Sequence, residues 1–103
     1  MNVLSRTPDG GAVVEVRGNS LGETAPAGRR LVLKEVSGRP EDGALCLFRN
    51  PLGYVYRRVD WRGANTVALH PETGDGSPAV LRWPEDEGEW EVIARVDRVL
   101  KPL

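Results

Sequence analysis

Ser20 is the residue of this 103-residue chain whose surroundings best suit covalent chemistry. It lies in the segment Gly18-Asn19-Ser20-Leu21, directly after a run of alternating apolar and charged residues. That pattern predicts a strand, so the Ser20 hydroxyl would emerge at a strand end, where it can face a substrate. A serine hydroxyl attacks a carbonyl only when a neighbouring base takes its proton. Peptidase-type chemistry therefore requires a base beside Ser20.

The sequence offers three candidate bases for this serine. His70 is the single histidine and precedes a proline, which favours a partly exposed position at the end of a strand. Lys34 alternates with leucines and is expected on the polar face of its strand, solvated and protonated. Lys101 lies at the C-terminal end. Serine after glycine and asparagine is also ordinary turn chemistry, so a purely structural role for Ser20 is the alternative.

Metal and cofactor chemistry has little support in the sequence. One histidine and one cysteine are too few for a zinc or transition-metal site. Cys46 stands between apolar neighbours and is expected in the core, where free cysteine is common. The acidic stretch Glu85-Asp86-Glu87 suits a solvated loop better than a cation site. We therefore expect no metal and no cofactor.

Charge and hydropathy exclude two further classes of function. Lys and Arg total 14 against 15 for Asp and Glu, so the net charge of −1 gives no basic excess for phosphate backbones. No helical pattern precedes Ala12, so a helix-turn-helix is missing and direct DNA binding is not expected. Apolar runs fall far short of the about 20 residues that cross a bilayer, and the N-terminus lacks a signal-peptide core. We expect a cytoplasmic protein without membrane contact.

The elements that would position these residues are mainly strands. The 12 glycines and 8 prolines separate short apolar runs, which favours many strands joined by turns. Asn50-Pro51-Leu52-Gly53 suits a hairpin loop. The last segment also fits helical spacing, although its β-branched residues favour a strand. Residues 1–11 are predicted to be a tail and 12–103 one domain. Seven strands are expected, over 12–17, 30–36, 44–49, 54–60, 65–70, 79–83 and 90–100.

Several short stretches follow one another in a fixed order along most of the chain. They are Val16-Arg17-Gly18-Asn19-Ser20-Leu21, Pro26-Ala27-Gly28 before Leu31-Val32-Leu33, Glu41-Asp42-Gly43-Ala44-Leu45-Cys46-Leu47, Tyr54-Val55-Tyr56-Arg57-Arg58-Val59, Thr66-Val67-Ala68-Leu69-His70-Pro71-Glu72, and Val92-Ile93-Ala94-Arg95-Val96-Asp97-Arg98-Val99-Leu100. This order resembles the self-cleaving serine peptidase domain of LexA and phage repressors, over about Ala12 to Lys101. The resemblance implies a bent, twisted, mostly antiparallel sheet with partly barrel-like closure.

The resemblance assigns Ser20 to the nucleophile position. Family members activate this serine with a desolvated, neutral lysine. Arg57 stands where that lysine is expected, in Tyr56-Arg57-Arg58-Val59. Arginine stays protonated at essentially any pH, so Arg57 cannot act as a general base. Leu21 replaces the family's usual methionine, which is a nearly isosteric change. A domain of peptidase type without its general base is therefore predicted.

Three hypotheses follow for the function. We favour a catalytically degenerate LexA-like domain in a repressor or DNA-damage (SOS) response context, which acts by association with itself, with a repressor or with another protein. Its long C-terminal strand would offer an edge for a homodimer. The second hypothesis is an active peptidase that cleaves a partner in trans, with Ser20 activated by Lys34, by His70 or through an unexpected geometry. The third is an unrelated small β-barrel binding module.

The family cleaves a bond upstream of its catalytic domain, in a segment that folds back across the active site. The nearest pair of small residues here is Gly11-Ala12, which opens the first predicted strand. This pair would reach Ser20 only if the strand came apart. The sequence therefore predicts no substrate bond within the chain.

Overall fold

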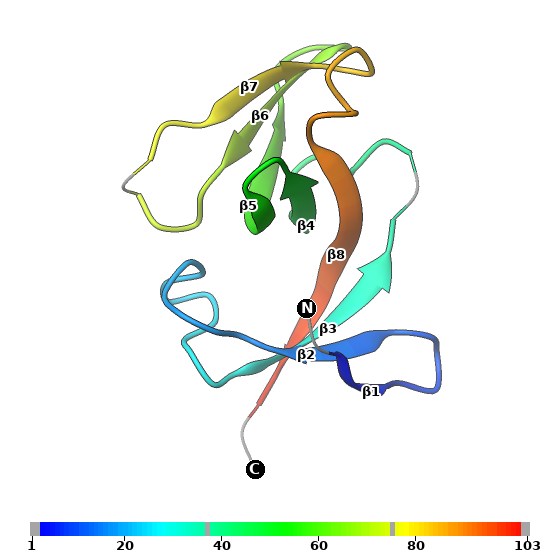
Figure 1. Ribbon diagram of the computed structural model, residues 1–103, viewed down its shortest axis with the longest axis vertical. Helices are drawn as coiled ribbons and strands as arrows, with labels where there is room; N and C mark the ends of the chain where they lie inside the picture. The colour runs from blue at the N-terminus through cyan, green and yellow to red at the C-terminus, as the bar shows by residue number, and fades with distance from the viewer. Residues whose placement is uncertain (1–2, 37, 75, 102–103) are drawn as a thin grey trace.

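Strands make up all the regular structure that the computed structural model describes, which covers residues 3–36, 38–74 and 76–101. They form one antiparallel sheet in the order β1-β2-β3-β8-β4-β5-β6-β7 (Figure 1). No helix among these residues is long and apolar enough to cross a membrane. The strands are β1 (Val3–Arg6), β2 (Ala12–Glu15), β3 (Arg30–Glu35), β4 (Leu45–Asn50), β5 (Gly53–Trp61), β6 (Thr66–His70), β7 (Ala79–Arg82) and β8 (Glu91–Leu100).

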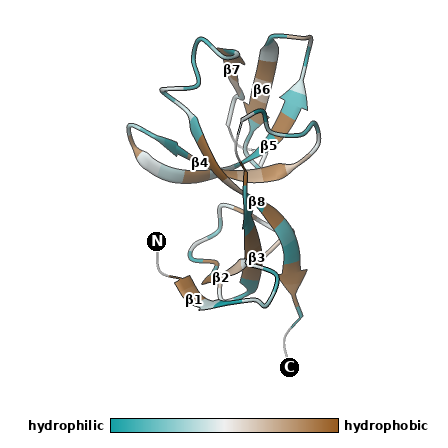
Figure 2. Ribbon diagram, turned by 90° about the vertical axis from the view of Figure 1, so that its right-hand side faces the viewer, coloured by the Kyte–Doolittle hydropathy of each residue, from teal (hydrophilic) through white to brown (hydrophobic). Residues whose placement is uncertain are grey.

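The sheet is bent and mostly antiparallel as predicted, but the expected partial closure into a barrel is wrong. β8 lies between β3 and β4, and the order ends at β1 and β7, which each pair with one strand. No pairing among the described residues joins these two edges. The bend instead separates the sheet into two ends (Figures 1 and 2). Each end buries its own hydrophobic core.

The seven predicted strands are all present, with shifted ends, and the last segment is a strand rather than a helix. The predicted hairpin joins β4 to β5, with Asn50 and Gly53 as its closing pair. The Asn50 side-chain oxygen accepts a hydrogen bond from the Leu52 N–H at 2.9 Å, as expected for asparagine in a turn.

The stretch 1–11, predicted as a tail, contains an additional strand. β1 pairs antiparallel with β2, and Arg6 lies opposite Ala12. The chain reverses at a turn in which the Thr7 N–H donates to the Gly11 carbonyl at 2.8 Å. All four residues of β1 are exposed, so no apolar alternation marks this strand in the sequence.

Two hydrophobic cores occupy the two ends of the bent sheet. β4 contributes to both, because its side chains alternate between the two faces. Leu45 and Leu47 belong to the first core, with β2, β3 and the Ser20 region. Cys46 and Phe48 belong to the second core, with β5, β6 and β7. Because both faces of β4 are buried, the strand begins with four consecutive apolar residues. One of these residues is Cys46, which lies in the core as expected.

Gly11 allows the turn between β1 and β2 to pack against the sheet. A Cβ at Gly11 would lie 2.7 Å from Val32 Cγ1 and 2.8 Å from Thr7 Oγ1. Val32 is fully buried, so it has no free space to move into.

We expect Gly11→Ala to lower the free energy of unfolding by about 1–3 kcal/mol, measured by urea denaturation. The control Gly63→Ala places its Cβ in open space and should change stability by less than about 0.5 kcal/mol. Equal losses in the two variants would contradict this account.

Candidate functional site

A cleft of about 430 Å³ lies between the turn that follows β2 and the first half of β5. Leu4, Glu15, Arg17 and Ser20 line it from the N-terminal part of the chain, and Leu47 with Tyr54, Val55, Tyr56 and Arg57 line it from the β4–β5 hairpin. The structure thus brings together Ser20 and Arg57, which lie 37 positions apart in the sequence.

The turn that carries Ser20 is anchored on both sides of the serine. Gly18 has a positive φ of 75°, a conformation that glycine adopts without strain, and it turns the chain away from β2. The residue after Ser20, Leu21, is fully buried in the first core, as is Ala25. The Gly22 N–H donates to the Asn19 carbonyl at 3.0 Å. Ser20 itself is exposed, so this turn presents its hydroxyl at the surface of the cleft.

Arg57 supplies a cation to the cleft rather than a base. One guanidinium nitrogen, Nη1, donates to the Tyr56 carbonyl at 2.8 Å. Burial lowers the pKa of the Arg57 guanidinium below its ordinary value. Arginine begins so far above neutrality that the group keeps its proton at physiological pH. A guanidinium in the same cleft as a serine can hold a carboxylate or a carbonyl oxygen of a bound segment, but it cannot accept the serine proton.

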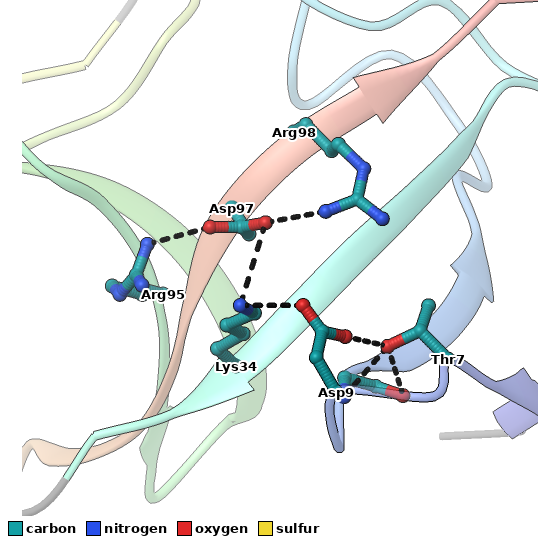
Figure 3. Close-up of polar contacts among 7 residues, drawn as sticks. Thr7, Asp9, Lys34, Arg95, Asp97 and Arg98 are labelled. Carbon is teal, nitrogen blue, oxygen red and sulfur yellow. Dashed lines mark hydrogen bonds and ion pairs between the residues drawn. The ribbon is translucent and has the colours of Figure 1, made fainter.

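Lys34 lies outside the cleft, in a charged network on β3 and β8. Its Nζ is 2.8 Å from the Asp9 carboxylate and 4.0 Å from that of Asp97 (Figure 3). Asp97 also accepts hydrogen bonds from Arg95 at 3.0 Å and Arg98 at 2.7 Å. The hydrogen bond from Lys34 is the main reason why the pKa of Asp9 lies well below its usual range. Lys34 therefore fastens the turn after β1 to the sheet.

His70 and Lys101 also lie outside the cleft. His70 Nε2 is 2.9 Å from the carboxylate of Asp60, on the neighbouring strand β5. This hydrogen bond is the main reason why the pKa of Asp60 is lowered. Lys101 directly follows β8 and is exposed. None of the three candidate bases from the sequence is among the residues that line the cleft.

One backbone edge of β5 lies open beside the cleft. β4 pairs with β5 from Gly53 to Arg58, whereas β6 pairs with it only from Arg58 to Trp61. Gly53–Arg57 therefore has no strand partner on its outer side within the described part of the chain. Such an edge presents backbone N–H and C=O groups to a second strand, and of these the Tyr56 carbonyl already accepts the hydrogen bond from Arg57. The sequence pattern located both β5 and β6 but gave no sign of how much of β5 would pair with β6.

Glu72 is a residue of the site that the sequence reasoning did not select. It follows β6, and its carboxylate accepts hydrogen bonds from Arg58 on β5 and from Thr24 in the turn that carries Ser20. The hydrogen bonds from Arg58, and then from Thr24, hold the pKa of Glu72 below its usual value. The Pro71-Glu72 pair in the LexA-like stretch was the available signal, but it says nothing about these partners.

Comparison with known proteins gives no match, either to protein-family models or among curated proteins. Within residues 3–36, 38–74 and 76–101, no three His, Cys, Asp or Glu side chains form a group that could hold a metal ion. The function is therefore argued from the cleft and its surroundings.

Proposed function

We propose that this chain is a LexA-like, peptidase-type domain that has lost catalysis and acts by binding other proteins. The observation that carries the proposal is the composition of the cleft, where Ser20 faces a site with Arg57 and without a lysine or histidine among its lining residues. Lys34 is held elsewhere in an ion pair with Asp9, and His70 elsewhere in a hydrogen bond with Asp60. A serine without a general base loses most of its reactivity, since proton transfer contributes about 10²–10⁴ in rate.

The open edge of β5 supports binding of an extended protein segment. Gly53–Arg57 borders the cleft and, among the residues that the structure describes, has no strand partner on its outer side, so a partner segment could pair with it as an additional strand. Arg57 and Arg17 would hold a carboxylate or carbonyl of that segment. By its resemblance to LexA, the partner is a repressor or another protein of the DNA-damage response.

A serine-reactive fluorophosphonate tests the loss of catalysis. We expect the natural chain to show no labelling of Ser20 at neutral pH, because the hydroxyl has no base to activate it. Intact mass spectrometry should show no added label on the natural chain or on Ser20→Ala. Ser5→Ala, which changes another exposed serine, is the matched control. Labelling that Ser20→Ala removes and Ser5→Ala retains would reject the proposal in favour of an active peptidase.

A second association surface is proposed on β8, as the route to a homodimer. β4 pairs with β8 only at Glu91–Arg95, whereas β3 pairs with it from Ala94 to Leu100. β8 is thus an interior strand whose last residues, Val96–Leu100, have an open edge on the β4 side within the described residues. An open edge of this length can pair with its symmetry mate around a twofold axis.

Sedimentation velocity tests this homodimer. We expect the natural chain to dimerise at micromolar concentrations and Leu100→Asp to weaken the dimer at least about tenfold, because a carboxylate would be placed beside the paired edges. Leu52→Asp is the matched control, since Leu52 is 95% exposed at the tip of the β4–β5 hairpin. A monomeric natural chain, or equal weakening by both changes, would reject this dimer.

A further inference from the structure

The Glu72 carboxylate joins two segments that form separate walls of the cleft. Its Oε1 accepts a hydrogen bond from Arg58 Nε at 2.8 Å, and its Oε2 accepts one from Arg58 Nη2 at 3.0 Å. Oε2 also accepts a hydrogen bond from the Thr24 hydroxyl at 2.7 Å. The two bonds from one guanidinium fix both the distance and the orientation of Glu72 relative to β5.

Each partner of Glu72 is close in sequence to a key residue of the cleft. Thr24 belongs to the turn that presents Ser20, and its N–H donates to the Leu21 carbonyl at 3.0 Å. Arg58 follows Arg57 directly on β5. Glu72 itself does not line the cleft. It is therefore placed to act on Ser20 and Arg57 through their neighbours.

The loop that carries Glu72 also touches the Ser20 turn directly. A Cβ at Gly22 would lie 3.3 Å from Thr73 Cγ2, so glycine at this position permits a close approach. In the Arg58–Glu72 pair the side chains are 40% and 11% exposed, whereas in the single-bonded Arg49–Glu91 pair both are 53% exposed. Removal of one partner from a shielded pair leaves the other charge unsatisfied, whereas an exposed pair contributes little.

We infer that Glu72 is a positioning residue of the cleft, which holds the Ser20 turn against β5 and thereby keeps Ser20 and Arg57 on the walls of one cleft. The meaning of this arrangement for partner binding rests on the proposed function. Its geometry can be tested without any partner.

A thiol at position 20 measures this geometry. In Ser20→Cys, the cation of Arg57 should lower the thiol pKa below its ordinary value of about 8.5, because a positive neighbour favours the thiolate. The pKa is obtained from the rate of alkylation by iodoacetamide between about pH 6 and 9.5. Cys46 does not interfere, since it is fully buried and burial raises its pKa to about 11.

Three further changes in the Ser20→Cys chain complete the experiment. Arg57→Met should return the thiol pKa to about 8.5, which calibrates the effect of Arg57. Glu72→Gln and Thr24→Val should each raise the thiol pKa by at least about half as much as Arg57→Met does, because the Ser20 turn moves away from β5 and from Arg57. The other charged residues that line the cleft, Glu15 and Arg17, are the same in every chain.

Glu91→Gln is the matched control, and it should leave the thiol pKa unchanged. A residue that supports only global stability would lower the urea midpoint without moving the thiol pKa. Thr24→Val removes a single hydroxyl, so it keeps the test valid if Glu72→Gln does not fold. The inference is overturned if Arg57→Met leaves the thiol pKa unchanged, or if Arg57→Met raises it and neither Glu72→Gln nor Thr24→Val does. Fluorophosphonate labelling of Ser20 in the natural chain would reject the proposed function but not this inference.

Discussion

Arg57→Lys is expected to make Ser20 reactive, with fluorophosphonate labelling about 10²-fold faster than in the natural chain. The position is partly buried, and the burial that lowers the pKa of Arg57 would also lower that of a lysine there. A lysine with a lowered pKa is neutral at a lower pH than a free lysine, and the neutral amine can accept the proton of the Ser20 hydroxyl. The labelling rate should therefore rise with pH as the new lysine becomes neutral.

Two controls define this result. Arg57→Lys combined with Ser20→Ala should show no labelling, which identifies the labelled residue. Arg49→Lys introduces a lysine on the neighbouring strand β4, at an exposed position that neither lines the cleft nor contacts Glu72, and should give no gain. If Arg57→Lys labels no faster than the natural chain at any pH, the cleft lacks the geometry of a serine–lysine pair and its likeness to a peptidase site is superficial.

Phe48→Ala is expected to lower the free energy of unfolding by about 3–5 kcal/mol. Phe48 is fully buried in the second core and packs edge-to-face on Trp90, with ring centroids 6.1 Å apart. Truncation removes this contact and leaves a cavity between β4 and its neighbours, which relax only in part. Urea denaturation followed by tryptophan fluorescence measures the loss.

Tyr54→Ala is the matched control for this core prediction. Tyr54 lies on the same hairpin but is 50% exposed, so its truncation should cost less than about 1 kcal/mol. A loss at Tyr54 as large as that at Phe48 would mean that the hairpin, rather than the second core, limits stability. Because β5 carries Arg57 on the strand next to Phe48, a stable second core is also a condition for an ordered cleft.

The cleft occurs where the bent sheet leaves strand edges incompletely paired. β6 covers only the second half of β5, and β4 covers only the first half of β8. The two open edges, Gly53–Arg57 and Val96–Leu100, are the surfaces on which partner binding and self-association are proposed. Both follow from unequal lengths of neighbouring strands rather than from any unusual residue.

The local pattern of the sequence was sufficient to predict most strands and turns. Alternation and β-branched residues identify β2 to β8, because side-chain period and turn chemistry act over a few neighbouring residues. The hairpin at Asn50 to Gly53 and the turn that presents Ser20 were predicted for the same reason. β1 was not, since its four exposed residues have no alternation and it forms only because β2 offers an edge.

The sequence by itself therefore predicted a mostly β domain, an exposed Ser20 after a strand, and an arginine at position 57, where the proposed resemblance to LexA would place a lysine. Only the tertiary structure decided that Ser20 and Arg57 line one cleft, that Lys34 and His70 are paired elsewhere, and that Glu72 joins the cleft walls. Strand order decided these points, because β8 lies between β3 and β4 through contacts distant in sequence. Such contacts depend on packing between residues that are distant in sequence, and the alternation of neighbouring residues carries no information about that packing.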